Sequence, residues 1–473
     1  MRKPRTLIVD DDSELLAVLS SKFKSLGHEV KAYPYIGENQ LNDIKTFDLV
    51  ILDQWIRGKR LGKPDLKGDD IARRLKDDKA IRNIPIVLIT GASITERAIL
   101  AEEALRSGLF KEVIGKPLYE NDLERIASYP IIPLNIGFVS LGRLAQKSIE
   151  ILFKEHPEYV ETVKGVSLTG MHKEENLKRV LNIEDEPRFK VYSSLEELIE
   201  QNCDIVLISS SNNAESRIKN GRNWLWNNEK ALQYDIWTRI IKKEKEMLLN
   251  EKSANSFYII ATNPIGMNIS LAEKLGLPAE RITGLSVIDT IRAKKWLKQR
   301  YFEQFNGQLD DNDFSVRVIG QHGLEIPIYD SIRIKGKSPE EIGFKIDMNK
   351  FTDDIRSEGG KIMESVKNLS RADMQETLYR GVPEAFVRLI GTLCRREQPV
   401  ESLYTKRNVS GALHLNGPSK IFYSENGITI QPKEIEAGIS KSEFSRLIKQ
   451  CEEEYEFQHH EVDSYIRERK IIK

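Results

Sequence analysis

His322 stands in a glycine-flanked turn and is a candidate for moving a proton in this sequence. His322 follows the apolar run Val318–Gly320, a pattern typical of a short β-strand that ends in a tight turn. Asp289 and Arg292 lie upstream, in a run that also has the composition of a strand. A carboxylate can orient a histidine and stabilise its charged form, and an arginine can hold a carboxylate through two parallel hydrogen bonds. These residues indicate an acid–base site for a small organic acid; the alternative is a core histidine and a surface Asp/Arg turn.

A second set of reactive side chains follows strand-like runs near the start of the chain, such as Thr6–Val9, Asp48–Leu52 and Ile84–Ile89. Helical patterns between several of these runs predict a parallel sheet, whose strands place their carboxyl ends at one edge. Converging carboxylates repel each other, and a hard divalent cation such as Mg²⁺ relieves that repulsion. A lysine and a hydroxyl nearby can bond to an added phosphoryl group. The set comprises Asp10, Asp11, Asp53, Thr90 and Lys116.

This N-terminal pattern resembles the receiver domain of bacterial response regulators. The resemblance implies that Asp53 accepts a phosphoryl group and that Asp10 and Asp11 help it to bind Mg²⁺. It also implies that Thr90 is the switch hydroxyl and that Lys116, before a cis proline bond, pairs with the phosphate. The implied partner is a sensor histidine kinase or a phosphotransfer protein.

A possible nucleotide-binding turn begins at Asn135, where a strand-like run is followed by glycines and then by a helical pattern. It resembles the dinucleotide fingerprint, in which glycines let the backbone approach a pyrophosphate at a helix N-terminus. Gly137 and Gly142 fit the first and third glycines of that fingerprint, and Val139 stands in place of the second. A Cβ at Val139 would crowd the pyrophosphate.

The next expected strand, Val163–Leu168, should end in an acid that binds the ribose hydroxyls. The sequence has Thr169, His172 and Lys173 in that region instead, and Glu174 follows them. Two interpretations stay open. These side chains accept a 2′-phosphate, which favours NADP, or the cofactor site has decayed.

The later motifs follow in the order Thr262-Asn263-Pro264, Asp289-x-x-Arg292 and Gly320-Gln321-His322-Gly323. Over about residues 133–450 this order resembles the lactate/malate dehydrogenase family of 2-hydroxyacid oxidoreductases. The resemblance implies that His322 takes the proton from the substrate hydroxyl as hydride leaves for nicotinamide. Asp289 would hold the imidazole, and Arg292 would bind the substrate carboxylate.

Three further residues take roles from the same resemblance. Asn263 would position substrate and nicotinamide, although an Asn-Pro turn is its simpler interpretation. Arg222 matches the mobile-loop arginine that polarises the carbonyl, and Arg217 matches a second carboxylate-binding arginine. Both lie in a polar segment expected to be a loop, Ser209–Arg222. Three arginines favour a dicarboxylate such as malate; the alternative is solvated loop charge.

Composition narrows the classes of function. Lys+Arg and Asp+Glu are both 72, so net charge gives no general attraction to nucleic acid. No apolar run approaches the roughly 20 residues that span a bilayer. The 3 cysteines show neither disulfide nor metal-site spacing, which favours reduced thiols and a cytoplasmic protein.

These patterns predict an α/β chain. We expect a flavodoxin-like, doubly wound receiver domain at 1–127, a linker at 128–134, a Rossmann-type NAD(P)-binding domain at 135–290 and an α+β lactate/malate dehydrogenase-like catalytic domain at 291–473. One departure from ordinary receivers is the segment Gln54–Gly68, which is longer than usual and rich in Lys, Arg and Gly.

The expected function is that of a two-component signalling protein, phosphorylated on Asp53, with a malate-like NAD(P)-dependent oxidoreductase module. The alternative is a non-catalytic response regulator whose dehydrogenase-like module senses a nucleotide or acid, or serves as a docking platform. Expected cofactors are Mg²⁺ and NAD or NADP. Expected partners are a small 2-hydroxy or 2-oxo acid and a second copy of the chain, with neither nucleic acid nor a membrane.

Overall fold

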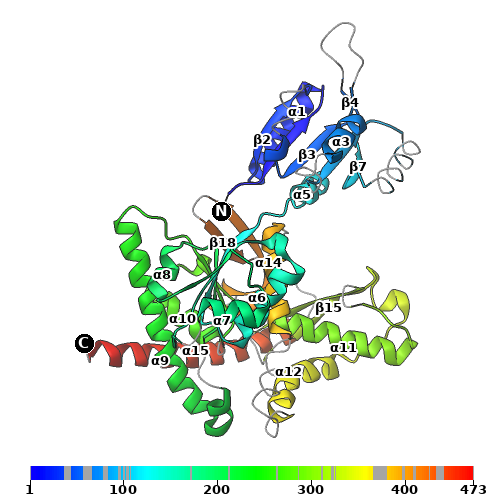
Figure 1. Cartoon of the computed structure of the whole chain (residues 1–473). Coiled ribbons are helices and arrows are strands. Elements are labelled where there is room, and N and C mark those ends of the chain that lie inside the picture. Colours follow the sequence, from blue (N-terminus) through cyan, green and yellow to red (C-terminus); the bar gives the residue numbers. More distant parts are fainter. Residues whose placement is uncertain are drawn as a thin grey trace. The chain divides into compact units, whose positions relative to one another are not determined.

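The structure is a computed structural model. It describes residues 2–36, 44–56, 66–77, 84–93, 97, 99, 102, 106, 108–170, 173–210, 214–262, 265–285, 287–310, 313–320, 324, 326–365, 381–396, 400–408, 412–424, 427–432 and 441–471. The chain forms two compact units, which are described separately. The first contains residues 1–133 with two short later segments, and the second contains nearly all the rest (Figure 1).

The first unit is built on a five-stranded parallel sheet with the order β2-β1-β3-β6-β7. This is the flavodoxin-like order of a doubly wound fold. Alternate residues of each strand enter two different cores: Leu7 and Val9 pack on one face and Ile8 on the other. Both faces are therefore buried, which explains the uninterrupted apolar runs. The elements of the sheet are β1 (Arg5–Val9), β2 (Glu29–Tyr33), β3 (Leu49–Asp53), β6 (Ile86–Thr90) and β7 (Glu112–Gly115).

Helices cover this sheet at both faces. The first begins where the Asp12 side chain accepts the backbone N–H groups of Glu14 and Leu15, which satisfies two donors that have no partner within a helix. It buries Leu19 and Phe23 against the sheet. The helical elements are α1 (Ser13–Ser25), η1 (Ile44–Thr46), α3 (Gly68–Asp77) and α5 (Glu120–Ala127).

A short antiparallel hairpin interrupts the connection from β3 to α3. Its strands are β4 (Trp55–Ile56) and β5 (Leu66–Lys67). The N–H of Gly68 donates to the carbonyl of Gln54 over 3.1 Å and closes the base of the hairpin. A Cβ on Gly68 would lie 2.5 Å from the carbonyl oxygen of Asp53, so only glycine fits there. The long segment Gln54–Gly68 therefore begins and ends beside the same aspartate.

The second unit contains a nine-stranded sheet with the order β10-β9-β8-β11-β12-β13-β16-β17-β18. The strands β8 to β13 are parallel and follow the 3-2-1-4-5-6 order of a Rossmann fold. β16 then joins β13 in the antiparallel direction. The strands are β8 (Leu134–Val139), β9 (Val160–Val166), β10 (Phe189–Tyr192), β11 (Ile205–Ile208), β12 (Phe257–Ile260), β13 (Ile282–Gly284), β16 (Val400–Asn408), β17 (Ala412–Ser424) and β18 (Gly427–Pro432).

The largest core of this unit joins segments that are far apart in the sequence. Trp237 packs edge-on against Tyr258, and Val462 from the last helix belongs to the same cluster. Two ion pairs, Lys230–Glu461 and Lys274–Asp463, also join α15 to the rest of the unit, and Lys230 is itself buried. The helices of the unit are α6 (Arg143–Glu155), η2 (Pro157–Tyr159), α7 (Glu174–Leu181), α8 (Leu195–Glu200), α9 (Ala214–Leu249), α10 (Ile265–Leu275), η3 (Ala279–Arg281), α11 (Val287–Phe305), η5 (Glu340–Ile342), α12 (Met348–Ser365), α14 (Val382–Cys394) and α15 (Lys441–Ile471).

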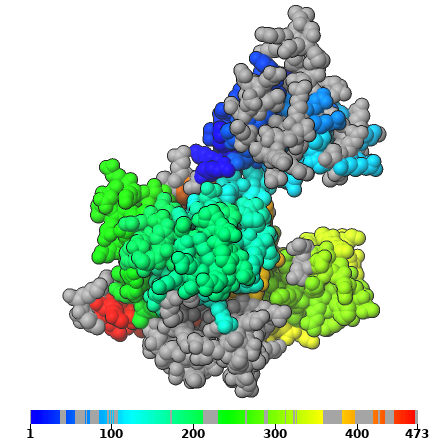
Figure 2. Space-filling view, viewed as in Figure 1, coloured from blue at the N-terminus to red at the C-terminus, as the bar shows by residue number. Residues whose placement is uncertain are grey.

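A separate small core lies under α11 and α12. There the antiparallel pair β14 (Phe314–Ile319) and β15 (Ile326–Ile334) packs against both helices through Leu297, Phe314 and Phe351. In the space-filling view these elements gather in the yellow-green region (Figure 2). Among the described residues, no helix is both long and apolar enough to cross a lipid bilayer.

Two local expectations were wrong. The run from Val287 to Arg292 is the start of helix α11 and is not a strand. Ala293 and Leu297 are fully buried four residues apart, and this helical spacing outweighs the β-branched composition before it. Arg217 and Arg222 lie on helix α9 rather than on a loop, because the helix already begins at Ala214.

Candidate functional site

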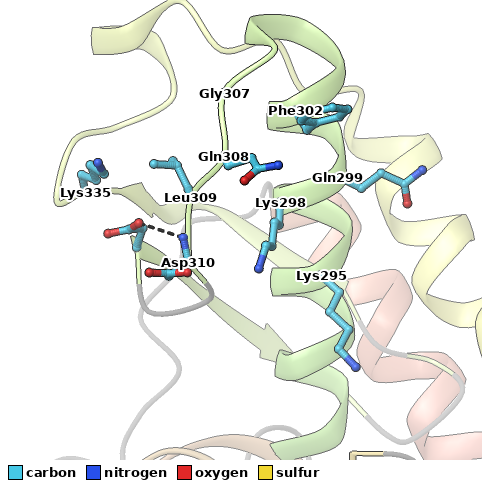
Figure 3. Close-up of a pocket in the computed structure, with 10 residues that line it drawn as sticks. Lys295, Lys298, Gln299, Phe302, Gly307, Gln308, Leu309, Asp310 and Lys335 are labelled. Carbon is cyan, nitrogen blue, oxygen red and sulfur yellow. Dashed lines mark hydrogen bonds between the residues drawn. The ribbon is translucent and has the colours of Figure 1, made fainter.

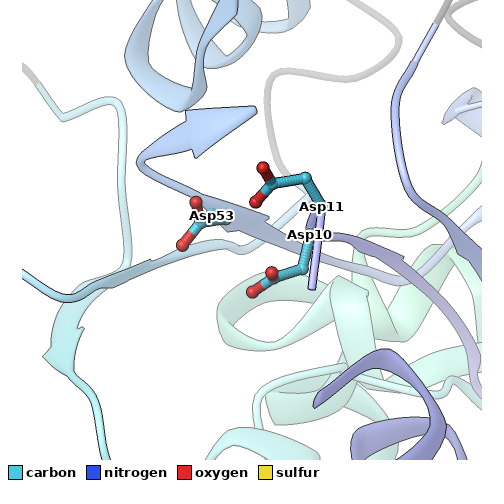
Figure 4. Close-up of side chains that lie close together, drawn as sticks. All are labelled: Asp10, Asp11 and Asp53. Carbon is cyan, nitrogen blue, oxygen red and sulfur yellow. The ribbon is translucent and has the colours of Figure 1, made fainter. Parts of the chain in front are cut away.

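Three carboxylates meet at the ends of β1 and β3. In the sheet Val9 is paired with Leu52, so the residues that follow each strand emerge side by side. Asp10, Asp11 and Asp53 have carboxylate oxygens that all lie within 4.8 Å of one another (Figure 4). Asp10 and Asp53 are buried, whereas Asp11 is exposed. A set of oxygen ligands that is open on one side fits a hard cation that keeps several waters, as Mg²⁺ does.

Lys116 forms ion pairs with two of these three carboxylates. Lys116 Nζ lies 2.8 Å from Asp10 Oδ2 and 2.9 Å from Asp53 Oδ1. Burial raises the pKa of Asp10, and hydrogen bonds from Lys116 and from the backbone of Asp12 only partly oppose this. Burial lowers the pKa of Lys116, but the hydrogen bonds to Asp10 and Asp53 outweigh it, so the pKa is raised overall. The lysine therefore stays charged and offsets part of the repulsion between the acids.

Thr90 completes this edge of the sheet. It ends β6, whose Ile89 is paired with Asp53, and it is fully buried. Its Oγ1 accepts the N–H of Ala92, and its carbonyl accepts the N–H of Lys116 over 2.8 Å. The peptide bond between Lys116 and Pro117 is cis. All five residues singled out in the N-terminal sequence thus lie at the carboxyl edge of one sheet.

The second unit has a tight turn at the equivalent edge, between β8 and α6. Ser140 adopts a φ of 77° there, which is unusual for a residue with a side chain. Its N–H donates to the carbonyl of Val166 over 3.1 Å. Ser209 Oγ lies 3.1 Å from the Ser140 carbonyl oxygen, and Gln146 Nε2 donates to the carbonyl of Leu141. Hydrogen bonds to the end of β9, to the residue after β11 and to helix α6 thus hold the turn.

This geometry shifts the glycine fingerprint by three residues. Val139 ends β8 and is fully buried in the core, so it does not face the turn. The sequence Ser140-x-Gly142-x-x-Ala145 instead occupies the positions of the G-x-G-x-x-G/A pattern, with Ser140 at the left-handed residue. Among the described residues, a Cβ on Gly142 would have only the Ser140 hydroxyl within 4.0 Å, so none of them fills the space above it. Ala145 is fully buried, as close helix–sheet packing requires.

Gly137 has a different role from the one expected. It lies inside β8, where a Cβ would approach Cys203 Sγ and Val206 to 3.2 Å. It is therefore a packing glycine within the sheet, and Val139 does not crowd a bound pyrophosphate. The signal that could have revealed the correct alignment is Ala145, the small residue three positions after Gly142.

The residues expected to perform the acid–base step are described only in part. His322 and Asn263 lie outside the described residues, as does His172. For Asp289, Arg217 and Arg222 the helical backbone alone is described. Arg292 is partly buried in the second turn of α11, three positions after Asp289.

A buried polar network, which was not predicted from the sequence, joins Thr262 to the start of α10 and to α9. Gln233 Nε2 donates to Glu229 Oε1 and to the carbonyl of Ser210, both over 2.9 Å. Thr262 Oγ1 donates to that same carbonyl, and Asn268 Nδ2 donates to the carbonyl of Thr262. Gln233, Glu229 and Asn268 are fully buried. The network thus fixes the chain after β11 and β12, where a Rossmann fold opens its ligand crevice.

An open hollow of about 830 Å³ lies beside the second half of α11 (Figure 3). Lys295, Lys298 and Lys335 line it together with Asp310 and Asp313, so its charges are mixed. Phe302, at its far end, is ten residues beyond Arg292, which corresponds to about 15 Å along a helix. At its other end the hollow reaches Lys295, which is only three residues beyond Arg292 on the same helix.

Comparison with known proteins gives a different match for each unit. No protein-family model matches the chain. A two-component response regulator of Arabidopsis thaliana is 27% identical over an alignment of 133 residues, and this match covers 25% of this chain and 59% of that protein. The chain thus spans about three-fifths of the length of this curated relative.

Solved dehydrogenase structures match the larger part of the chain. Malate dehydrogenase of Cryptosporidium parvum superposes with a TM-score of 0.55 at 19% identity, covering 70% of this chain and 100% of that one. Malate dehydrogenase of Aeropyrum pernix gives 0.54 at 15%, covering 69% and 97%. Lactate dehydrogenase of C. parvum, solved with lactic acid and nicotinamide adenine dinucleotide, gives 0.54 at 16%, with the same coverage.

The chain joins a response-regulator-like region to a malate/lactate dehydrogenase fold. The predicted fold class, α/β with a flavodoxin-like sheet and a Rossmann sheet, is confirmed.

Proposed function

We propose that this chain is a two-component signalling protein that accepts a phosphoryl group on Asp53 and binds NAD(P) and a small 2-hydroxy or 2-oxo acid in its second unit. The observation that carries the first half is the position of Lys116 Nζ, within 2.9 Å of both Asp10 and Asp53. The shifted fingerprint at Ser140–Ala145 supports the second half. We assign the receiver to residues 1–127, a linker to 128–134, the dinucleotide-binding part to 135–290 and the catalytic part to 291–473.

In the receiver, a carboxylate oxygen of Asp53 would attack the phosphorus of a phosphohistidine or an acyl phosphate. A new P–O bond forms as the bond to the donor group breaks, and the donor leaves with the electron pair. Asp10, Asp11 and Asp53 would hold Mg²⁺, which neutralises charge on the transferring group. Lys116 and Thr90 would then bond to the phosphoryl oxygens. The donor would be a sensor histidine kinase or a phosphotransfer protein.

In the second unit, His322 would accept the proton of the substrate hydroxyl, and Asp289 would orient its ring. Arg292 would hold the substrate carboxylate, with Asn263, Arg217 and Arg222 contributing to the same site. NAD(P) would supply the hydride acceptor when bound, above the backbone of Gly142. Self-association of the chain is part of the proposal.

A non-catalytic function is the second candidate. It is favoured by the sequence after β9, where no carboxylate occurs before Glu174, and by the helical backbone at Arg217 and Arg222. In that case the crevice binds a nucleotide or an acid as a signal, and turnover is absent.

The phosphoryl proposal is tested by incubating the full-length chain with acetyl phosphate and Mg²⁺ and measuring the intact mass. We expect the mass to increase by one phosphoryl group. The increase should not occur when a chelator is added before acetyl phosphate. Asp53→Asn should abolish the addition, whereas Asp70→Asn, an exposed acid on α3, should not. Equal phosphorylation of the Asp53→Asn variant would falsify the assignment.

The oxidoreductase proposal is tested by titrating the full-length chain with NADH and NADPH and then adding oxaloacetate or pyruvate. Binding with turnover that His322→Asn removes supports the enzyme. Binding without turnover of any 2-oxo acid supports the sensing function. No binding of either nucleotide rules out both forms of the proposal for the second unit.

A further inference from the structure

We infer that the dinucleotide crevice of the second unit prefers NADP(H) to NAD(H). This inference rests on the proposed function, namely that the turn Ser140–Ala145 binds a nicotinamide dinucleotide. The residues that distinguish the two cofactors lie at the end of β9 and the start of α6.

The structure fixes where the adenosine ribose must lie. In a Rossmann fold the ribose nearest the pyrophosphate turn meets the end of the second strand. Here that strand is β9, which is paired with β8 so that Val166 lies opposite Val139. The N–H of Ser140 donates to the carbonyl of Val166, so the turn and the end of β9 are in direct contact. The residues after Val166 therefore line the ribose position.

No acid follows Val166 within reach of a ribose. The next residues are Ser167, Leu168, Thr169 and Gly170, and the first carboxylate is that of Glu174 on α7. An NAD-binding site uses a carboxylate here to accept hydrogen bonds from the ribose hydroxyls. A hydroxyl side chain can donate to a phosphate oxygen but brings no negative charge against it.

Glu174 is already committed to other groups. Its Oε2 accepts the backbone N–H of Val191 on β10 over 3.0 Å. Its Oε1 lies 3.0 Å from Lys178 Nζ and 3.9 Å from Lys190 Nζ. These contacts hold the carboxylate on the β10 side of α7 and neutralise its charge. Glu175 is exposed and lies nine residues beyond the end of β9.

Basic residues adjoin both chain segments that meet at this ribose position. Arg143 is the first residue of α6, directly after Gly142, and it is exposed. Lys173 precedes α7 and is also exposed. An arginine near the ribose is the usual means of accommodating the 2′-phosphate of NADP, since its planar fork binds phosphate oxygens in pairs. Ser167, which is buried, and Thr169, which is exposed, follow β9 and add hydroxyl groups to this segment.

The first test compares affinities for full-length protein by fluorescence titration with NADPH and NADH, and by competition with adenosine 2′,5′-bisphosphate against 5′-AMP. We expect NADPH to bind about tenfold or more tightly than NADH, since each hydrogen bond to a charged group contributes on the order of tenfold. Adenosine 2′,5′-bisphosphate should compete better than 5′-AMP by a similar factor.

Two variants test whether these residues cause the preference for NADP(H). Arg143→Gln should weaken NADPH binding about tenfold and leave NADH binding unchanged. Lys147→Gln is the matched control, since it removes the same charge one turn further along α6. Ser167→Asp introduces the missing acid and should reverse the preference by repelling the 2′-phosphate. If Ser167→Asp does not fold, Arg143→Gln still decides the matter.

The outcomes separate this inference from the proposal beneath it. Equal or tighter binding of NADH, or equal loss of both nucleotides in Arg143→Gln, overturns the NADP preference and leaves the dinucleotide site standing. Failure of both nucleotides to bind overturns the site itself and the preference together.

Discussion

The two parallel sheets of this chain have similar topology and opposite chemistry at their carboxyl edges. In the first unit β1 and β3 end in carboxylates, and the edge attracts a cation. In the second unit β8, β9 and β11 are followed by Ser140, Ser167 and Ser209, and the edge offers hydroxyl and backbone donors. The doubly wound fold determines where a ligand binds. The side chains that directly follow the strands determine which charge it must carry.

The two edges also differ in how they are stabilised. The acidic edge holds buried carboxylates whose repulsion Lys116 only partly offsets, so a bound cation should stabilise it further. The polar edge is held by hydrogen bonds from Ser209 and Gln146 to the carbonyls of the turn. In the described part of the chain this edge shows no comparable cluster of carboxylates, so we expect it to be stable before a ligand binds.

The largest expected effect is at the start of α3 in the acidic unit. Gly68→Ala would place a Cβ 2.5 Å from the Asp53 carbonyl oxygen and 2.7 Å from Leu88. We expect a loss of about 1–3 kcal/mol in the free energy of unfolding, together with slower phosphorylation, because Asp53 must shift. Urea denaturation followed by intact-mass phosphorylation kinetics would measure both. Gly91→Ala is the control, because a Cβ there meets none of the described residues within 4 Å, and we expect it to be harmless.

At the polar edge, Gly142→Ala should separate binding from stability. A Cβ at Gly142 points into open space, so the midpoint of thermal unfolding should not change. Nucleotide affinity should fall about tenfold, or roughly 1.4 kcal/mol, because the methyl group occupies the place of the pyrophosphate. Gly165→Ala provides the contrast, since its Cβ would lie 2.5 Å from Leu141 and should destabilise the protein. Unchanged affinity in Gly142→Ala would contradict the shifted fingerprint.

A smaller effect concerns the charge of Asp10. Its pKa in the folded protein is raised above the ordinary 3.8, chiefly by burial, so the native state holds its proton to higher pH than the unfolded chain does. Stability should therefore fall as pH rises from 3.8 through the raised pKa, and the cost persists at neutral pH. Asp10→Asn should raise the melting temperature of the metal-free protein by about 2–4 °C.

Calorimetry of the wild type and of Asp10→Asn at several pH values, with and without Mg²⁺, would measure these changes in melting temperature. Mg²⁺ should stabilise the wild type more than Asp10→Asn, because the cation offsets the same repulsion that the substitution removes. Asp70→Asn, at an exposed position, should behave as wild type throughout. A destabilised Asp10→Asn in the absence of metal would show that the bond to Lys116 outweighs the cost of burial.

The smallest expected effect is at Ser140. A left-handed backbone costs a residue with a side chain on the order of 1 kcal/mol, and glycine avoids this cost. Ser140→Gly should therefore stabilise the second unit by about that amount while nucleotide affinity is retained. Ser140→Val should destabilise it. If chemical denaturation gave a less stable Ser140→Gly, a role for the Ser140 hydroxyl in holding the turn would be indicated.

The sequence predicted the acidic edge well because its signals are local. Each acid directly follows a continuous apolar run, and such runs in a buried parallel sheet are hard to misplace. The turn at Ser140 was misaligned because Gly137 and Gly142 stand at fingerprint spacing by coincidence. Gly137 is required by Cys203, a contact across the sheet that the local sequence does not reveal.

The helical start of α9 was missed for a related reason. Ile236, Trp237 and Ile240 in its later half are buried at helical spacing, and they anchor the helix in the core. A helix once nucleated extends at little cost, so it continues back through the polar residues around Arg217. The buried network of Glu229, Gln233 and Asn268 could not be predicted, since it joins residues from separate elements through backbone carbonyls.

Helix α15 determines which of the two units can finish folding first during synthesis on the ribosome. Val462 and Ile466 complete the core that also contains Val139 and Ile208, more than 250 residues earlier in the sequence. Helices α8, α9 and α10 already pack in this core, but the part that Val462 and Ile466 cover stays exposed until α15 has been synthesised. Exposed apolar surface of this kind is prone to aggregation. The strands of the receiver sheet leave the ribosome first and pair only with one another. In a nascent chain, the edge that we propose accepts a phosphoryl group should therefore form before the edge that we propose binds a nucleotide is stable.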